Sequence, residues 1–166
     1  FSLNKLKECL SQYIMIKTEK VRIEGIMREK LAKYEQIRQD ITLLEQSKAG
    51  DFSIMLDGKQ YTERPAAGDA FALLYRTINE NHAKDDFEFE IGSYRGFRLC
   101  LNLHPLSRGI ILRGTSRYST DIGSSGQGTI TRIENLAERI PFYLVNTQRD
   151  LEEAEKQLEA ARQQMG

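Results

Sequence analysis

The stretch ITRIENLAERIPFYLVNTQRDLEEAEKQLEAARQQM, residues 130–165, decides the fold. Its apolar positions recur every three or four residues, which places them on one side of a helix; they are Ile133, Leu136, Ile140, Leu144, Thr147, Leu151, Ala154, Leu158, Ala161 and Met165. Most other positions carry charged or amide side chains. A helix with one apolar side gains most of its stability by packing that side. The stretch therefore predicts a second long helix elsewhere in the chain.

The ends of this helix are also marked. Thr131 followed by Glu134 is a capping-box pattern, in which each side chain bonds the other's backbone N–H. Pro141 lacks an N–H and its ring clashes with the preceding turn, so it predicts a kink or a short break. Gly166 is a suitable stop.

The partner helix is predicted at residues 3–48. Leu3, Leu6, Leu10 and Tyr13 begin its apolar side, which resumes after a stretch where apolar residues cover more of the circumference, at Met27, Leu31, Tyr34, Ile41 and Leu44. A shift of register or contact with a third element explains that stretch. We expect the two helices to form an antiparallel coiled-coil pair.

The residues between the helices predict a small head. Asp57-Gly58 is a strong two-residue turn, so residues 52–63 form a hairpin. Pro65 fits the first turn of a helix that extends to about Asn81. Apolar alternation predicts strands at residues 87–91 and 97–103, and a third strand from Gly109 to Arg113 that continues toward Tyr118. We expect four or five strands with one helix.

The predicted fold class is thus α+β, with three parts at residues 1–49, 50–129 and 130–166. Lys and Arg together number 24 and so do Asp and Glu, so the chain lacks an overall basic character that would favour nucleic acid. No run approaches about 18 apolar residues, so we expect no membrane span. Cys9 and Cys100 lack metal-ligand spacing and are interpreted as free thiols of a cytoplasmic protein. Phe1 in place of Met predicts a fragment of a larger polypeptide.

The sequence contains only weak motifs for catalysis, metal binding or phosphate binding. The glycine loop 123–128 precedes a helix and suggests a phosphate site with Arg132 nearby, but it lacks a P-loop Lys-Ser/Thr and favours a flexible joint. His82 and His104 lack ligands at metal spacing. Glu88 and Glu90, with Asp85 and Asp86, are typical of a solvated strand face. We predict no enzyme activity, no metal and no cofactor.

Arginines and tyrosines interleave from residue 94 to 118. Such a surface holds a nucleic-acid backbone or stacks on bases, whereas the plainer interpretation is cross-strand pairing with Glu88 and Glu90. If the chain contacts DNA, the residues predicted to bind phosphate are Arg95, Arg98, Arg113 and Arg132.

Several segments together carry a resemblance: FSIMLDGKQYTER with AAGDAFALL, then IGSYRGFRLCLNL, then GSSGQGTITRIENLAERI and the terminal coil. The chain resembles the C-terminal region of large helicase and adenine-DNA-methylase-like proteins of bacterial conjugative elements, plasmids and phages. The resemblance implies a non-catalytic accessory module of a DNA-processing protein, with the rest of that polypeptide as its partner. It carries over no site residues. The alternative is a scaffolding coil that binds protein, for example by forming a homodimer.

Overall fold

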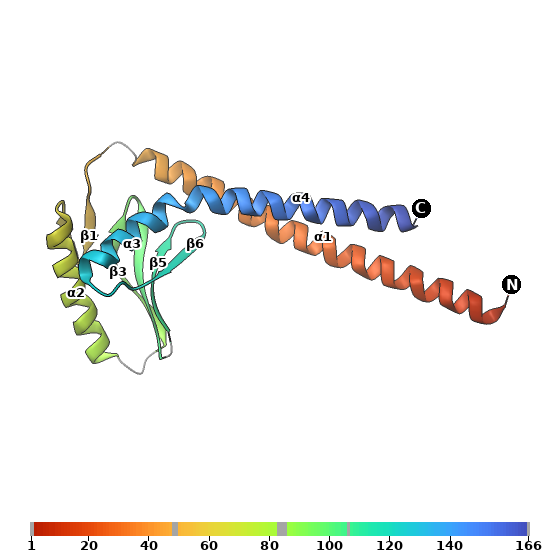
Figure 1. The fold of residues 1–166 in the computed structure, drawn as a ribbon, viewed down its shortest axis with the longest axis horizontal. Helices are drawn as coiled ribbons and strands as arrows, with labels where there is room; N and C mark the ends of the chain where they lie inside the picture. The colour runs from red at the N-terminus through yellow and green to blue at the C-terminus, as the bar shows by residue number, and fades with distance from the viewer. Residues whose placement is uncertain (1, 48–49, 83–85, 106, 166) are drawn as a thin grey trace. The chain divides into compact units, whose positions relative to one another are not determined.

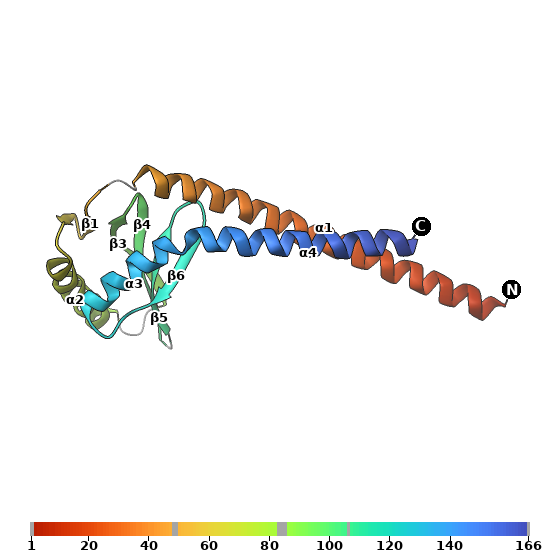
Figure 2. The same ribbon diagram turned by 45° about the horizontal axis from the view of Figure 1, so that its top comes forward.

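The two ends of the chain form long helices, α1 (Leu3–Gln46) and α4 (Ile140–Met165), which pack together. They run antiparallel, as Figure 1 and Figure 2 show. The computed structural model describes residues 2–47, 50–82, 86–105 and 107–165, and its α+β architecture confirms the predicted fold class. The predicted helix end at Lys48 and the stop at Gly166 lie outside these residues.

The chain divides into two compact units. The helical unit comprises residues 1–35 and 143–166, and the head comprises residues 36–142. The head therefore includes the last turns of α1, whose Ile37, Asp40 and Leu44 are buried. These units differ from the predicted parts at 1–49, 50–129 and 130–166, because periodicity does not show where one continuous helix changes its neighbours.

In the helical unit, the packed apolar residues form a small seam. Ile23 lies against Ala154 and Leu158, and Met27 packs beside them. An ion pair also joins the two helices, because Lys30 Nζ lies 3.2 Å from Asp150 Oδ2. Higher residue numbers on α1 face lower numbers on α4, which is the antiparallel arrangement. This seam is the predicted coiled-coil contact.

The beginning of α1 corrects one expectation. Leu3, Leu6, Leu10 and Tyr13 do not pack on α4: their exposed fractions are 67%, 52%, 58% and 48%. The reason is length, since α1 has 44 residues and α4 has 26. The shorter helix covers only part of the longer one.

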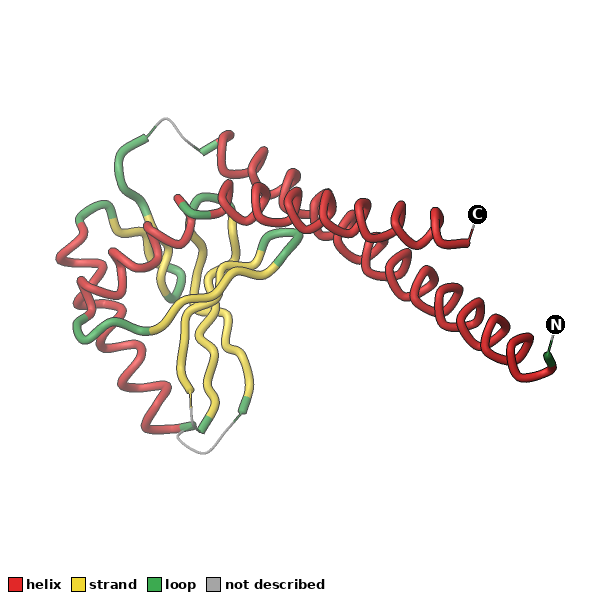
Figure 3. The backbone as a smooth tube through the Cα atoms, turned by 45° about the vertical axis from the view of Figure 1, so that its right-hand side comes forward, coloured by secondary structure: helices red, strands yellow, loops and turns green. Residues whose placement is uncertain are grey.

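The head is built on a six-stranded antiparallel sheet in the order β2-β1-β3-β4-β5-β6. Figure 3 shows the strands in yellow, with the two shorter helices on one side of them. The strands are β1 (Ile54–Leu56), β2 (Lys59–Tyr61), β3 (Phe87–Tyr94), β4 (Phe97–His104), β5 (Ser107–Arg113) and β6 (Arg117–Asp121). The expected four or five strands become six because the predicted third strand is two strands, separated by a reversal at Gly114–Ser116.

The two tight hairpins follow the turn chemistry of the sequence. Asp57 and Gly58 have φ of 52° and 78°, and Arg95 and Gly96 have φ of 50° and 85°. Two successive positive φ values are the type I′ geometry that suits twisted strands. The second turn is shorter than the interval 92–96 between the two predicted strands, since Gly92 belongs to β3. A Cβ there would collide with the Met55 carbonyl oxygen, so glycine lets β1 approach β3 closely.

The two helices of the head are α2 (Arg64–Asn81) and α3 (Gly126–Glu138). Pro65 lies in the first turn of α2, as predicted. The predicted C-terminal helix is two helices, and its start is earlier than Thr131: Ser125 caps α3 by accepting a hydrogen bond from Gly128 N. The capping box at Thr131 and Glu134 is therefore wrong, because both residues lie inside α3.

The expected break near Pro141 is present but lies just before it. α3 ends at Glu138 and α4 begins at Ile140, so Pro141 occupies the first turn of α4, where its missing N–H costs nothing.

The glycines next to the start of α3 have a packing role. Gly126 packs against Gly68 of α2 so closely that a Cβ on Gly126 would collide with the Gly68 carbonyl oxygen. These two glycines let the helices α2 and α3 approach closely, a packing role that the sequence did not indicate.

The core of the head lies between the sheet and its helices. The buried residues from β4, β5, α2 and α3 include Phe97, Leu99, Leu101, Leu103, Ile110, Leu112, Phe71, Ile130, Ile133 and Leu136. No helix within the described ranges is both long and apolar enough to cross a membrane.

Candidate functional site

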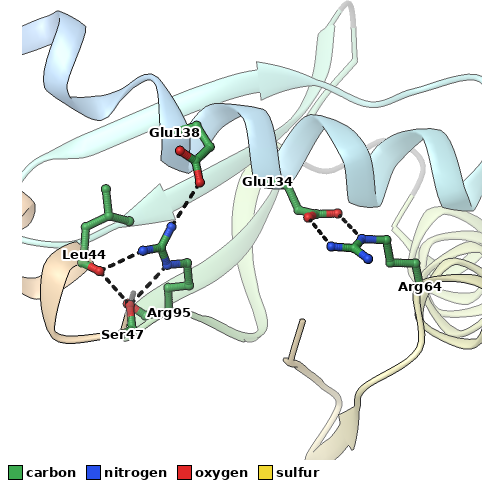
Figure 4. A network of polar contacts seen from close by, with 6 residues as sticks. All are labelled: Leu44, Ser47, Arg64, Arg95, Glu134 and Glu138. Atoms are coloured by element: carbon green, nitrogen blue, oxygen red, sulfur yellow. Dashed lines mark hydrogen bonds and ion pairs between the residues drawn. The ribbon is translucent and has the colours of Figure 1, made fainter. Parts of the chain in front are cut away.

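The head contains a cleft of about 410 Å³ where the end of α1, the β1 region, the β3–β4 turn and the helices α2 and α3 meet. Its walls carry Asp51 and four further charged side chains that pair with one another, Arg64, Arg95, Glu134 and Glu138. Glu134 and Glu138 are one turn apart on α3, so both carboxylates face the cleft. Figure 4 shows the four side chains and their partners. We call it the arginine–glutamate cleft.

Arg95 is held by three elements. Its Nη2 donates to the Leu44 carbonyl oxygen at 2.8 Å, its Nε donates to Ser47 Oγ at 3.2 Å, and its Nη1 lies 3.3 Å from Glu138 Oε1. Leu44 is in the last turn of α1, where carbonyl groups lack helical partners. Arg95 therefore caps α1 and fixes it to the β3–β4 turn and to α3, and only 16% of its side chain is exposed.

Arg64 makes the second ion pair of the cleft. Its Nε and Nη2 donate to the two carboxylate oxygens of Glu134 at 2.9 and 3.0 Å. This bidentate geometry is the strong form of an arginine–carboxylate pair. The guanidinium also lies over the ring of Phe52, 4.8 Å from its centroid. The pair joins the start of α2 to α3.

The chemistry of the cleft follows from these pairs. The two guanidinium groups and the two carboxylates neutralise each other. Burial, and then the negative charge of Glu134, raises the pKa of Tyr94, so its hydroxyl stays protonated near neutral pH. The cleft holds elements of the head together, and its groups do not form a nucleophile activated by a base.

The other face of the sheet carries two of the four predicted binding arginines. Alternation along β4 and β5 places Arg98 and Arg113 opposite the core, and their register aligns Arg98 with Arg113 and Arg113 with Arg117. Carboxylates of β3 offset this row of like charge: Glu88 Oε2 lies 2.7 Å from Arg113 Nη2, and Glu88 Oε1 lies 3.0 Å from Arg117 Nη2. Arg98 Nη1 lies 3.6 Å from Glu90 Oε1. The cross-strand pairing considered in the sequence is what these residues form.

The four residues predicted to bind phosphate do not share one surface. Arg98 and Arg113 lie on the open face of the sheet, Arg95 lies in the cleft, and Arg132 is exposed on α3. Arg132 has no ion pair within the described part of the chain. Arg95 has a structural role, since it caps α1. The sequence did not indicate this role, because Arg95 and Arg98 are close in sequence but the turn at Arg95-Gly96 places their side chains on different surfaces.

The two histidines have aromatic and acidic neighbours. The His82 ring lies 4.7 Å from the Phe89 ring, centroid to centroid. His104 Nε2 lies 3.8 Å from Asp86 Oδ2. Over the described ranges, no group of three or more His, Cys, Asp or Glu residues is placed to hold a metal ion.

Comparison of the chain with protein-family models, with curated proteins and with solved structures found no match. Function must therefore be argued from the surface of this chain.

One surface feature stands out that the sequence showed only in part. Among the exposed large apolar side chains near the start of α1, five lie at heptad spacing or next to it: Leu3, Leu6, Leu10, Tyr13 and Ile14. We call them the apolar stripe. The sequence indicates this exposure by its spacing. Tyr13 and Ile16 are three residues apart where the heptad requires four, so the apolar stripe lies on a different side of α1 from the seam.

Proposed function

We propose that this chain is a non-catalytic interaction module whose helical unit docks another helix on the apolar stripe. The observation that carries the proposal is the exposure of Leu3, Leu6, Leu10, Tyr13 and Ile14 within about three turns of α1. An exposed contiguous apolar patch marks an interaction site, and apolar residues at heptad spacing are the pattern that a partner helix recognises. The resemblance to helicase–methylase proteins suggests that the module works within a larger DNA-processing polypeptide.

The test compares the stripe with the seam in dilute solution. Leu10→Ala should change the free energy of unfolding by less than about 0.5 kcal/mol, because Leu10 is exposed. Ile23→Ala should lower it by about 2 kcal/mol, because Ile23 is buried in the seam. Urea unfolding followed by circular dichroism measures both. If Leu10→Ala destabilises the chain as much as Ile23→Ala, the stripe is covered within the molecule and the proposal fails.

Direct contact with DNA is a second candidate function. It is favoured by the row of Arg98, Arg113 and Arg117 on the open face of the sheet, where three cations are offset by Glu88 and Glu90. Phosphate groups of DNA can compete for guanidinium groups held by exposed pairs, because such pairs are weak.

A fluorescently labelled duplex titrated at about 50 mM salt tests this candidate. If DNA binds to this row, Arg98→Ala and Arg117→Ala should each weaken binding and lower the salt slope by about one. Arg22→Ala is the control, since Arg22 pairs with Glu19 on the helical unit and lies outside the row. Arg95→Ala is unsuitable because it removes the cap of α1. Lack of binding at this salt concentration removes DNA contact.

A further inference from the structure

The arginine–glutamate cleft contains one polar group that the contacts of the head leave unused, the hydroxyl of Tyr94. Only 8% of Tyr94 is exposed, and the residue lines the cleft. Besides burial, the charges that act on its pKa all belong to the cleft, so the hydroxyl faces the cleft; they are Glu134, Arg95, Glu138 and Arg64. Within the described ranges of the chain this hydroxyl makes no hydrogen bond. Buried polar groups are normally paired, so water or a polar ligand that displaces it must satisfy the hydroxyl.

The charge balance of the cleft selects the sign of that ligand. Three carboxylates and two guanidinium groups line it, so the described walls carry one excess negative charge. The end of α1 adds to this charge, because Ser47 next to it lines the cleft and the last turn of α1 carries no basic side chain. A helix C-terminus favours a cation. The cleft therefore favours a positively charged ligand over an anion.

The carboxylates of the cleft keep acceptor positions for such a cation. Glu138 contacts Arg95 through one oxygen, at 3.3 Å, and 73% of its side chain is exposed. Asp51 is exposed at the cleft and makes no ion pair with another described residue. A carboxylate can accept about four hydrogen bonds. Asp51 and Glu138 can thus accept N–H groups of a ligand without breaking the pairs that hold the head together.

The size and lining of the cleft fit a ligand as large as an amino-acid side chain. Its volume of about 410 Å³ lies within the range of about 300–1,000 Å³ that is usual for small-molecule sites. Phe52 and Met55 are half-buried residues of the same cleft and provide apolar contact. An alkyl chain with a cationic end matches this combination, because its stem packs on apolar surface while its charge stays among polar groups.

We propose that the arginine–glutamate cleft binds an alkyl chain that ends in an ammonium or guanidinium group, held by Asp51, Glu138 and the Tyr94 hydroxyl. A lysine or arginine side chain of another protein and a free alkylammonium compound share this chemistry. The inference is independent of the apolar stripe, since the stripe belongs to the helical unit and the cleft to the head.

Titration of the 166-residue chain with N-acetyl-lysine-N-methylamide, followed by amide chemical shifts in NMR spectra, tests the proposal. Signals of Asp51 and Tyr94 should shift with a dissociation constant of about 1 mM, because ion pairs in a solvated cleft are weak. N-acetyl-norleucine-N-methylamide has the same alkyl chain without the ammonium group, and it should bind about tenfold more weakly or less. Equal binding of the two compounds, or no shift up to about 20 mM of the lysine compound, overturns the proposal.

Two variants locate the binding site in the cleft. Asp51→Asn removes an exposed carboxylate, and Tyr94→Phe removes the hydroxyl while keeping the ring. Each should raise the dissociation constant of the lysine compound about fivefold or more. Asp69→Asn is the matched control, because Asp69 is exposed on α2 outside the cleft lining, and it should bind as the wild type does. An unchanged constant for Asp51→Asn, or for a Tyr94→Phe variant whose spectrum shows the native fold, contradicts the proposed site.

Butylammonium distinguishes the two sources of the cation, because it carries the ammonium group without peptide groups. Tighter binding of the lysine compound assigns the cleft to a protein side chain, whereas equal binding assigns it to a free alkylammonium compound, and either result supports the proposal. Binding of both compounds should weaken as salt is added, since ions screen exposed charges. Binding that does not respond to salt shows that the ammonium charge is not recognised, and it overturns the proposal.

Discussion

Asp40 shows at the residue scale how one side chain can hold a helix against a sheet. It is 1% exposed, and its carboxylate accepts hydrogen bonds from Thr115 N at 2.6 Å, Ser116 N at 2.8 Å and Tyr118 Oη at 2.7 Å. Hydrogen bonds to charged groups are stronger than neutral ones, and a buried donor left without a partner is costly. Asp40 therefore fixes the last turns of α1 to the β5–β6 reversal.

Replacing Asp40 should unfold the head more easily. Asp40→Ala leaves three buried or half-buried donors without their acceptor, so we expect the free energy of unfolding to fall by about 3 kcal/mol. Urea unfolding measures this loss. Gln39→Ala is the neighbouring control, because Gln39 Oε1 accepts an exposed hydrogen bond from Thr115 Oγ1, and it should cost less than about 0.5 kcal/mol. Equal effects of the two changes would contradict the role of Asp40.

Glu88 gives the open face of the sheet a pH dependence. Burial raises its pKa, but hydrogen bonds from Arg113 and Arg117 outweigh burial and hold the pKa below its ordinary value of 4.5. A carboxylate whose pKa is lower in the folded chain than in the unfolded chain stabilises the fold above the unfolded pKa. That contribution disappears as the pH falls through the folded value.

Glu88→Gln should therefore destabilise the chain by about 1 kcal/mol near pH 7, a modest value because the carboxylate is partly solvated. The difference between the wild type and Glu88→Gln should shrink to about zero as the pH falls below the folded pKa of Glu88. Unfolding curves at several pH values between about 3 and 7 provide the measurement. A difference that stays constant across this range would show that Glu88 acts by packing alone.

At the scale of elements, the close crossing of α2 and α3 should reverse the usual stabilising effect of replacing a helix glycine by alanine. Replacing glycine by alanine inside a helix usually stabilises it by about 0.5–1 kcal/mol. At Gly126 the new Cβ would collide with the Gly68 carbonyl oxygen of α2, whereas at Gly25 of α1 the nearest atom is Arg28 Nη2 at 3.8 Å, an ordinary contact.

We therefore expect opposite signs for two identical substitutions. Gly126→Ala should lower the free energy of unfolding by about 2 kcal/mol, because α3 must shift away from α2. Gly25→Ala should raise it by about 0.5 kcal/mol, because only helix propensity changes. Thermal or urea unfolding of both variants decides the matter. A stabilised Gly126→Ala variant would mean that the two helices do not approach closely.

At the scale of the whole molecule, the two cysteines report on the two compact units. Cys9 is exposed in the helical unit and Cys100 is buried in the head. Burial, followed by the negative charges of Glu88 and Glu90, raises the pKa of the Cys100 thiol, so even less of it is the reactive thiolate.

A thiol reagent added to the dilute folded chain should modify Cys9 quickly and Cys100 only through opening of the head. Absorbance of the released thiol-reagent product gives the two rates. The Cys9→Ser variant should lose the fast phase entirely and keep the slow one. Two fast phases in the wild type would contradict the burial of Cys100.

The candidate surfaces could be predicted only in part. The interleaved arginines at residues 94–118 were recognised from sequence, together with their pairing to Glu88 and Glu90. The sequence did not separate Arg95 from Arg98, because the turn at Arg95-Gly96 sends one side chain into the cleft and the other to the open face. The ion pair of Arg64 with Glu134 joins residues 70 positions apart, and short-range patterns do not specify such pairs.

The sequence by itself determined the α+β class, the two long helices, both hairpin turns and the break before Pro141, because helix periodicity, turn conformations and proline sterics act between near neighbours. Only the tertiary structure decided where α1 passes from the helical unit to the head, and that Gly126 lies at a close helix crossing. These features depend on which distant surfaces meet. The apolar stripe depends on both sequence and tertiary structure. Its spacing can be seen in the sequence, and its exposure follows from α4 being shorter than α1.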